Sequence, residues 1–185
     1  ALQTMRSLTY VLPGQTLSCV GCHEPRDQAP PSGGPLLAMR GTPSKLTRGP
    51  EGSWPLRFDR LVQPVLDRSC TECHRPGGAD VKAARFDLTE PNAYRNLMTF
   101  GEKNLETLAF EKDRSEVNFG VARQSRLLAL LRQDAAHKAV RLDEDSVERL
   151  VTWMDTYAQS QGHFSPEQER QLLAMKDRYR HLLAE

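Results

Sequence analysis

The chain has 185 residues, with 25 lysines and arginines against 24 aspartates and glutamates, and a formal net charge of +1. This balance excludes a general nucleic-acid or membrane-surface binder, which would carry a clear basic excess. No run of about twenty apolar residues is present, so the sequence predicts no membrane span. The length suits one domain or two small lobes, and the apolar content of 38% predicts a thin core.

The first informative segment is Cys19-Val20-Gly21-Cys22-His23, and the same pattern returns at Cys70-Thr71-Glu72-Cys73-His74. In Cys-x-x-Cys-His the two thiols bond to the vinyl groups of a c-type haem and the histidine ligates its iron. Two copies use all four cysteines of the chain. We therefore predict two c-type haems. The predicted attachment residues are Cys19, Cys22, Cys70 and Cys73, and the predicted proximal iron ligands are His23 and His74.

Other uses of the four cysteines fit the pattern less well. A four-thiolate zinc site does not need a histidine after each cysteine pair. A thioredoxin-like site pairs one motif with a βαβ pattern, and none is visible. A disulfide across two intervening residues closes too small a loop to stabilise much. Haem attachment is the favoured interpretation.

The segment between Pro25 and Pro55 contains seven of the twelve prolines and five glycines, which exclude a helix or a central strand. We expect a long loop that wraps the cofactor, with a flexible linker as the alternative. The predicted organisation is a first haem-binding segment with this wrap at 1–55, followed by a cytochrome c-like helical domain with the second haem at 56–185.

Helical spacing of apolar residues begins at Phe58 and continues to Arg68, directly before the second motif. Pro64 falls inside this stretch and predicts a kink or a late helix start. Beyond the motif, 85–89 is expected to be a short strand or an extended arm. Further helices are predicted over 123–132, from the acidic segment at 143 towards Gly162, and from Ser165 to the C-terminus. No convincing sheet is indicated, so the expected fold is mainly α.

The sixth ligand of each iron decides between electron transfer, which needs a closed iron, and ligand binding or catalysis, which needs an open one. His137 is the best candidate for the second haem because it is expected in a non-helical turn between two amphipathic helices. For the first haem the candidates are Met39, His163 and an open position, and the residues do not decide among them.

Some further side chains have two interpretations. Met154 and Met175 lie on apolar helix stripes, where a methionine usually fills the core. Arg26, Arg40 and Arg75 stand near the haem motifs and either pair with haem propionates or remain at the surface.

Two strings carry a resemblance to a known family. Leu8-Thr9-Tyr10-Val11-Leu12-Pro13-Gly14 precedes the first motif, and Val62-Gln63-Pro64-Val65-Leu66-Asp67 precedes the second. With Arg149-Leu150-Val151-Thr152-Trp153-Met154-Asp155, they make nearly the whole chain similar to the C-terminal dihaem cytochrome c region of hydrazine synthase α subunit-like proteins. Members usually carry a β-propeller upstream, so the resemblance implies an excised or processed fragment.

The resemblance also bears on the iron ligands. Related small cytochromes offer an axial methionine from a Met-Pro-Pro turn, and here the corresponding turn contains His137. The resemblance therefore implies that the second haem has two histidine ligands. The hydrazine-forming enzyme uses a tyrosine shortly after its first motif, where this chain has Glu24-Pro25-Arg26-Asp27. This departure argues against carrying over the synthase activity.

The leading functional prediction is an extracytoplasmic, periplasmic dihaem electron-transfer domain, because c-type haem is attached outside the bacterial cytoplasm. Its expected partner is a redox protein or an upstream domain of the same polypeptide, and not a nucleic acid. Whether the chain is itself an enzyme stays open. The alternative is a redox enzyme or accessory domain whose first haem has an open site for a small substrate, and a haem-based sensor is a weaker third possibility.

Overall fold

The computed structural model describes residues 41–42, 48–111, 120–161 and 165–182, so the first Cys-x-x-Cys-His motif lies outside the described residues. The described part is mainly helical, and its only β-type pairings are two isolated bridges, which confirms the mainly α prediction. None of the described helices is long and apolar enough to cross a membrane. The helices are α1 (Phe58–Leu61), α2 (Gln63–Ser69), α3 (Ala93–Glu106), α4 (Val121–Gln124), α5 (Arg126–Gln133), α6 (Ala135–Lys138), α7 (Glu144–Asp155) and α8 (Pro166–Arg178).

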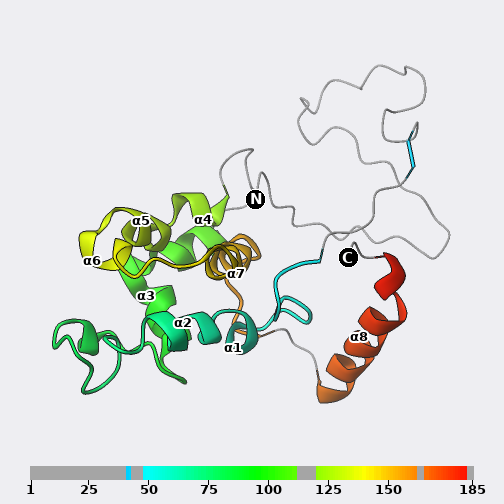
Figure 1. Cartoon of the computed structure of the whole chain (residues 1–185), viewed down its shortest axis with the longest axis horizontal. Helices are drawn as coiled ribbons and strands as arrows, with labels where there is room; N and C mark the ends of the chain where they lie inside the picture. Colours follow the sequence, from blue (N-terminus) through cyan, green and yellow to red (C-terminus); the bar gives the residue numbers. More distant parts are fainter. Residues whose placement is uncertain (1–40, 43–47, 112–119, 162–164, 183–185) are drawn as a thin grey trace.

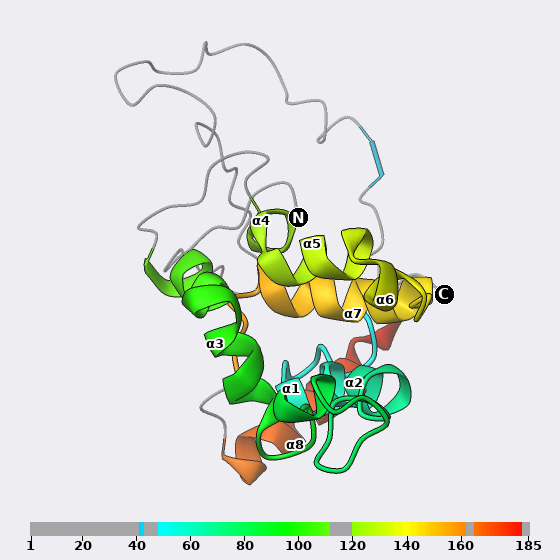
Figure 2. The same ribbon diagram turned by 90° about the vertical axis from the view of Figure 1, so that its left-hand side faces the viewer.

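The helices form two levels that α3 connects. In Figures 1 and 2, α4, α5, α6 and α7 lie at one level, α1 and α2 lie at the other, and α3 runs between them. Short helical turns complete the described part, namely η2 (Ala83–Arg85), η3 (Thr107–Glu111) and η4 (Arg180–Leu182). The helix α8 lies to one side, beyond the turn that precedes α1 (Figure 1).

The predicted entry helix is present as two pieces. The first, α1, ends at Leu61, and α2 begins at Gln63 with Pro64 in its first turn. Proline is tolerated there because the first amides of a helix have no intrahelical acceptor. The prediction of a kink or late start at Pro64 is therefore confirmed, and α2 leads directly into Cys70.

A cluster of three aromatic rings joins the two levels. Phe58 of α1 packs edge-on against Trp153 of α7, with ring centroids 5.2 Å apart, and against Tyr94 of α3, with centroids 5.4 Å apart. Trp153 is completely buried. Such edge-to-face pairs add to the free energy gained by burying the rings. This contact places the segment before the second motif against the last helix of the core.

The last two helices begin at strong caps. Asp143 accepts a hydrogen bond from the backbone N–H of Ser146 and starts α7. Ser165 and Gln168 form the predicted capping box of α8. The α-helical part of α8 ends at Arg178, earlier than the predicted C-terminal end.

Other expectations differ from the structure. The helix predicted over 123–132 is broken at Ser125, whose hydroxyl caps α5, and α3 was not predicted. Of the two alternatives for 85–89, the strand is wrong: Ala83–Arg85 is a 3₁₀ turn, and residues 87 and 88 have no regular secondary structure. Met154 fills the core as expected, but Met175 is 46% exposed because α8 has no buried residue among those described.

We predict that Gly52→Ala costs about 3 kcal/mol of unfolding free energy. Gly52 has φ +87°, and an added Cβ would lie 2.4 Å from the carbonyl oxygen of Arg60. Left-handed backbone and a steric clash with α1 would then act together. The control is Gly77→Ala, where φ is +74° but nothing lies within 4 Å, so about 1 kcal/mol is expected. Urea unfolding measures both, and equal costs would contradict the close packing at Gly52.

Candidate functional site

The second motif forms a helical turn at the end of α2. The backbone N–H of Cys73 donates to the carbonyl oxygen of Cys70 over 3.2 Å, and the N–H of His74 donates to the same oxygen over 2.9 Å. Both cysteines are free thiols; Cys70 is partly buried and Cys73 is exposed. The turn therefore brings two unpaired thiols and the following histidine into one short segment.

The Cys70 thiol is poorly suited to thiolate chemistry. Burial raises its pKa to about 11, with a further contribution from neighbouring Cys73. Reactive redox cysteines have lowered pKa values, because the thiolate is the nucleophile. The environment of Cys70 thus argues against the thioredoxin-like alternative.

His74 is held in place by the segment around Phe86. Its Nδ1 lies 3.1 Å from the carbonyl oxygen of Phe86. A carbonyl can only accept, so Nδ1 carries the proton and Nε2 is left as the free ring nitrogen. The backbone N–H of Leu88 donates to the carbonyl oxygen of His74 over 2.8 Å. The first bond orients the imidazole ring, and the second holds the backbone of His74. Both partners belong to the Phe86–Leu88 loop.

That loop is itself tied to its surroundings. The Asp87 carboxylate accepts hydrogen bonds from the hydroxyl and N–H of Thr89 and from the side-chain amide of Asn92, at 2.7 to 2.9 Å. The hydroxyl of Thr89 is the largest cause that lowers the pKa of Asp87. From α2, the buried Gln63 amide donates to the carbonyl oxygen of Leu88 over 3.0 Å.

His137 is held by an acidic neighbour. It lies on α6, so the expected non-helical turn is in fact a short helix that Asp134 caps. Asp134 accepts from the backbone N–H groups of Ala136 and His137, and its Oδ2 lies 2.7 Å from Nδ1 of the His137 ring. These bonds to His137 lower the pKa of Asp134. A carboxylate only accepts when ionised, so Nδ1 is again the donor and Nε2 is free.

The two histidines lie together although 63 positions separate them in the chain. Their ring centroids are 6.0 Å apart and their planes differ by 33°. Two imidazoles that share one metal ion through bonds of about 2 Å have centroids about 6 Å apart, since each centroid lies about 1 Å behind its nitrogen. The ring separation is therefore compatible with two imidazoles that bind one metal ion.

The surroundings of both rings also suit metal ligation. A ligating histidine usually donates its second ring N–H to a carboxylate or a backbone carbonyl, which fixes the tautomer. Both acceptor types occur here, one on each ring, and within the described residues neither Nε2 has a hydrogen-bond partner. No group of three or more His, Cys, Asp or Glu side chains arranged around a metal was found in the described ranges. A haem iron takes only two protein ligands.

Of the remaining predicted site residues, the structure describes only Arg75. Arg75 is exposed and has no ion pair within the described ranges. The residues that lie outside the described part are Cys19, Cys22, His23, Arg26, Met39, Arg40 and His163. The predicted set that the structure brings together is Cys70, Cys73, His74 and His137.

Sequence reasoning missed the groups that orient the two histidines. Asp134 could have been found, because an aspartate three residues before a histidine at the start of a helix is a typical N-cap. The carbonyl of Phe86 carries no sequence signal, since every residue has one. Gln63 was visible only as part of the entry helix, and its bond to Leu88 depends on the tertiary fold.

No family model, no curated protein and no solved structure matches this chain.

We predict that acid weakens the loop that holds His74. The pKa of Asp87 is lowered in the folded chain, so its contribution to stability is present above the ordinary aspartate pKa of about 4 and is lost as pH falls through the lower folded value. Asp87→Asn should unfold more easily at pH 6, and the difference from the unsubstituted chain should shrink towards pH 3. Thermal unfolding across this range measures it. Asp177→Asn, on α8, is the control, and an equal pH effect there would contradict the role of Asp87.

Proposed function

We propose that the chain is a dihaem c-type cytochrome domain that transfers electrons between its two haems and a redox partner. The observation that carries the proposal is the 6.0 Å separation of the His74 and His137 rings beside the free thiols of Cys70 and Cys73. In this proposal Cys70 and Cys73 attach the second haem, His74 is its proximal ligand and His137 is its distal ligand. When bound, the haem supplies a one-electron Fe(III)/Fe(II) couple.

The chain's own residues would set the properties of that iron. The Phe86 carbonyl and the Asp134 carboxylate hold the two Nδ1–H groups, and each orients the Nε2 atom of its ring. The negative charge of Asp134, 2.7 Å from the His137 ring, would stabilise the oxidised iron. Two histidine ligands give a lower potential than histidine with methionine, because methionine ligation raises it.

Electron transfer is favoured over catalysis at this haem. With His74 and His137 both holding it, the iron would have no position left for a substrate, whereas electron transfer would need only a partner's cofactor nearby. Cys73 and its neighbours Glu72 and Arg75 are exposed, so the attached edge of the haem would lie near the surface. This is the edge at which a redox partner would approach.

The duplicated motif extends the proposal to the first haem, with Cys19 and Cys22 as attachment residues and His23 as proximal ligand. Its sixth ligand would be Met39, His163 or none. The resemblance to the C-terminal region of hydrazine synthase α subunit-like proteins supports a redox partner protein or an upstream domain as the electron donor or acceptor. Covalent haem attachment supports a periplasmic or other extracytoplasmic location.

The proposal is tested by the reduced optical spectrum of protein matured with haem, recorded with and without carbon monoxide. Two c-type haems per chain, and a second haem that carbon monoxide does not shift, are expected. A spectrum without c-type bands contradicts the whole proposal. If carbon monoxide shifts the bands of half of the haem, one iron is open. The favoured function is then a redox enzyme that acts on a small molecule.

We predict that His137→Ala converts half of the total haem from low spin to high spin and opens it to carbon monoxide, because one iron loses its distal ligand. The control is His181→Ala, which removes an exposed imidazole on η4 that packs against Tyr179. Optical and electron paramagnetic resonance spectra measure the spin state. An unchanged low-spin spectrum in His137→Ala would remove His137 from the site.

We also predict that Asp134→Asn raises the potential of the second haem, changing its reduction equilibrium by a factor of roughly 3 to 10. Asparagine keeps the helix cap and the hydrogen bond but removes the charge that favours the oxidised iron. The control is Asp143→Asn, the same change at the cap of α7. Spectroelectrochemical titration measures both, and equal shifts would show only a general charge effect.

A further inference from the structure

The helix α3 contains a left-handed turn near its C-terminal end. Its right-handed path stops at Phe100, and Gly101, Glu102 and Lys103 have φ values of +61°, +61° and +60°. Glycine adopts such values freely, but each of the other two residues costs free energy, because the Cβ of an L-residue comes too close to the following carbonyl oxygen. Strained backbone persists only where surrounding contacts hold it, and it gathers at functional sites. The residues that contact the turn therefore indicate its role.

Arg126, the first residue of α5, holds the turn from one side. Its Nη1 donates to the carbonyl oxygen of Gly101 over 3.0 Å, and its backbone N–H donates to the side-chain oxygen of Asn104 over 2.8 Å. The guanidinium also lies 3.6 Å from the exposed Glu102 carboxylate. A Cβ added to Gly101 would lie 2.8 Å from Cδ of Arg126, so this side chain packs closely on the turn. The turn is thus attached to the helix that leads to α6, which carries His137.

On its other side, the turn adjoins a row of three rings that begins with Phe100 and ends at His74. Phe100 packs edge-to-face against Phe86, with ring centroids 5.8 Å apart, and Phe86 packs edge-to-face against His74, with centroids 6.0 Å apart. All three residues are partly buried. The same Phe86 supplies the carbonyl oxygen that lies 3.1 Å from Nδ1 of His74. Phe100 therefore supports the residue that accepts the ring proton of His74.

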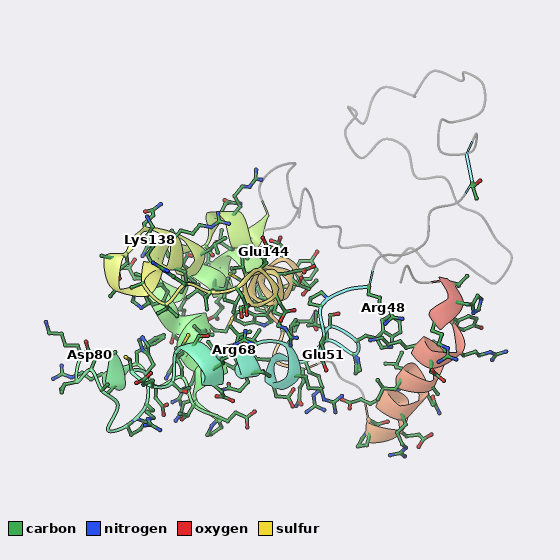
Figure 3. All side chains as sticks on the ribbon, viewed as in Figure 1. Arg48, Glu51, Arg68, Asp80, Lys138 and Glu144 are labelled. Atoms are coloured by element: carbon green, nitrogen blue, oxygen red, sulfur yellow. The ribbon has the colours of Figure 1, made fainter. Side chains whose placement is uncertain are left out.

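The turn lies on a path of contacts that joins the two proposed iron ligands. On the His74 side the path is the row of rings, and on the His137 side it is Arg126 and α5, which α6 follows. Figure 3 shows both sides at one end of the molecule, where Lys138 stands next to His137 and Asp80 belongs to the loop after His74. Supporting contacts of this kind fix the positions of two ligands before the group that they bind arrives.

On the basis of the proposed function, we propose that Phe100 is a positioning residue for the second haem, and that the left-handed turn held by Arg126 keeps it in place. Phe100 confines the Phe86 ring and so keeps the carbonyl of that residue on the Nδ1–H of His74. A hydrogen bond at Nδ1 raises the basicity of a ligating histidine. A more basic ligand favours Fe(III) over Fe(II), because the oxidised iron has the greater charge. Loss of the Phe100 ring therefore weakens this bond and raises the potential of the second haem.

The test is a spectroelectrochemical titration of the dihaem protein with Phe100→Leu, which keeps an apolar side chain but removes the ring. The control is Phe110→Leu, the same change at an exposed ring on η3. The second haem is the titration wave that is missing from a Cys70→Ala, Cys73→Ala variant. We expect the reduction equilibrium constant of that haem to rise about threefold in Phe100→Leu, less than for loss of a direct partner of the ligand, and to stay unchanged in Phe110→Leu. Phe100→Tyr, which keeps the ring, should keep the original value.

Arg126→Ala tests the turn by the direction of the shift, and because Arg126 is exposed it also serves if Phe100→Leu does not fold. Removing a positive charge by itself favours the oxidised iron, whereas release of the turn frees Phe100 and favours the reduced one. A rise in the reduction equilibrium constant of the second haem is therefore expected. Arg123→Ala, the same change at an exposed arginine of α4, should show no rise. A fall or no change in Arg126→Ala contradicts the role of the turn.

The outcomes separate this inference from the proposed function. Equal shifts in Phe100→Leu and Phe110→Leu, or no shift, overturn the role of Phe100 while the cytochrome proposal stands. A Phe100→Tyr protein with the same shift as Phe100→Leu also overturns it, because the aromatic ring would then have no part. A chain that matures without haem overturns the proposed function and this inference with it.

Discussion

The packing of Phe58 against Trp153 is the contact on which the arrangement of the two histidines depends. Phe58 is on α1, and α2 continues from it to Cys70 and His74; Trp153 is on α7, and the short α6 with His137 comes just before α7. Holding α1 against α7 therefore decides how far the second motif lies from His137. Because Trp153 is completely buried, this contact excludes water and the helices have little freedom to slide.

Hydrogen bonds then set the orientation of each histidine ring between the packed helices. His74 depends on the Phe86 carbonyl, whose loop is tied to α2 through Gln63 and to the start of α3 through Asp87. His137 depends on Asp134, which caps the helix and accepts the ring proton at once. Apolar packing brings the rings together, and these directional bonds leave both Nε2 atoms available. The division of roles is typical of a metal-ligand pair, in which the supporting groups matter as much as the ligands.

The helix α8 is held to the rest of the described part by polar contacts rather than by buried side chains. Its Glu169 accepts a hydrogen bond from Arg57 over 2.8 Å, and its Leu172 carbonyl oxygen accepts one from the Trp54 indole over 3.0 Å. No residue of α8 is buried. The position of α8 therefore depends on Arg57 and Trp54 in the segment before α1.

Local sequence signals determined much of the secondary structure and the chemistry of the second motif. Helical spacing with Pro64 predicted the entry helix, Ser165 and Gln168 predicted the cap of α8, and the Cys70-to-His74 pattern named the proposed haem residues, since each of these depends on neighbours in the chain. Only the tertiary structure decided that His137 lies beside His74, that Phe86 and Asp134 orient the rings, and that Met175 is exposed while Met154 is buried. Those outcomes depend on contacts between distant segments, which no local pattern of residues encodes.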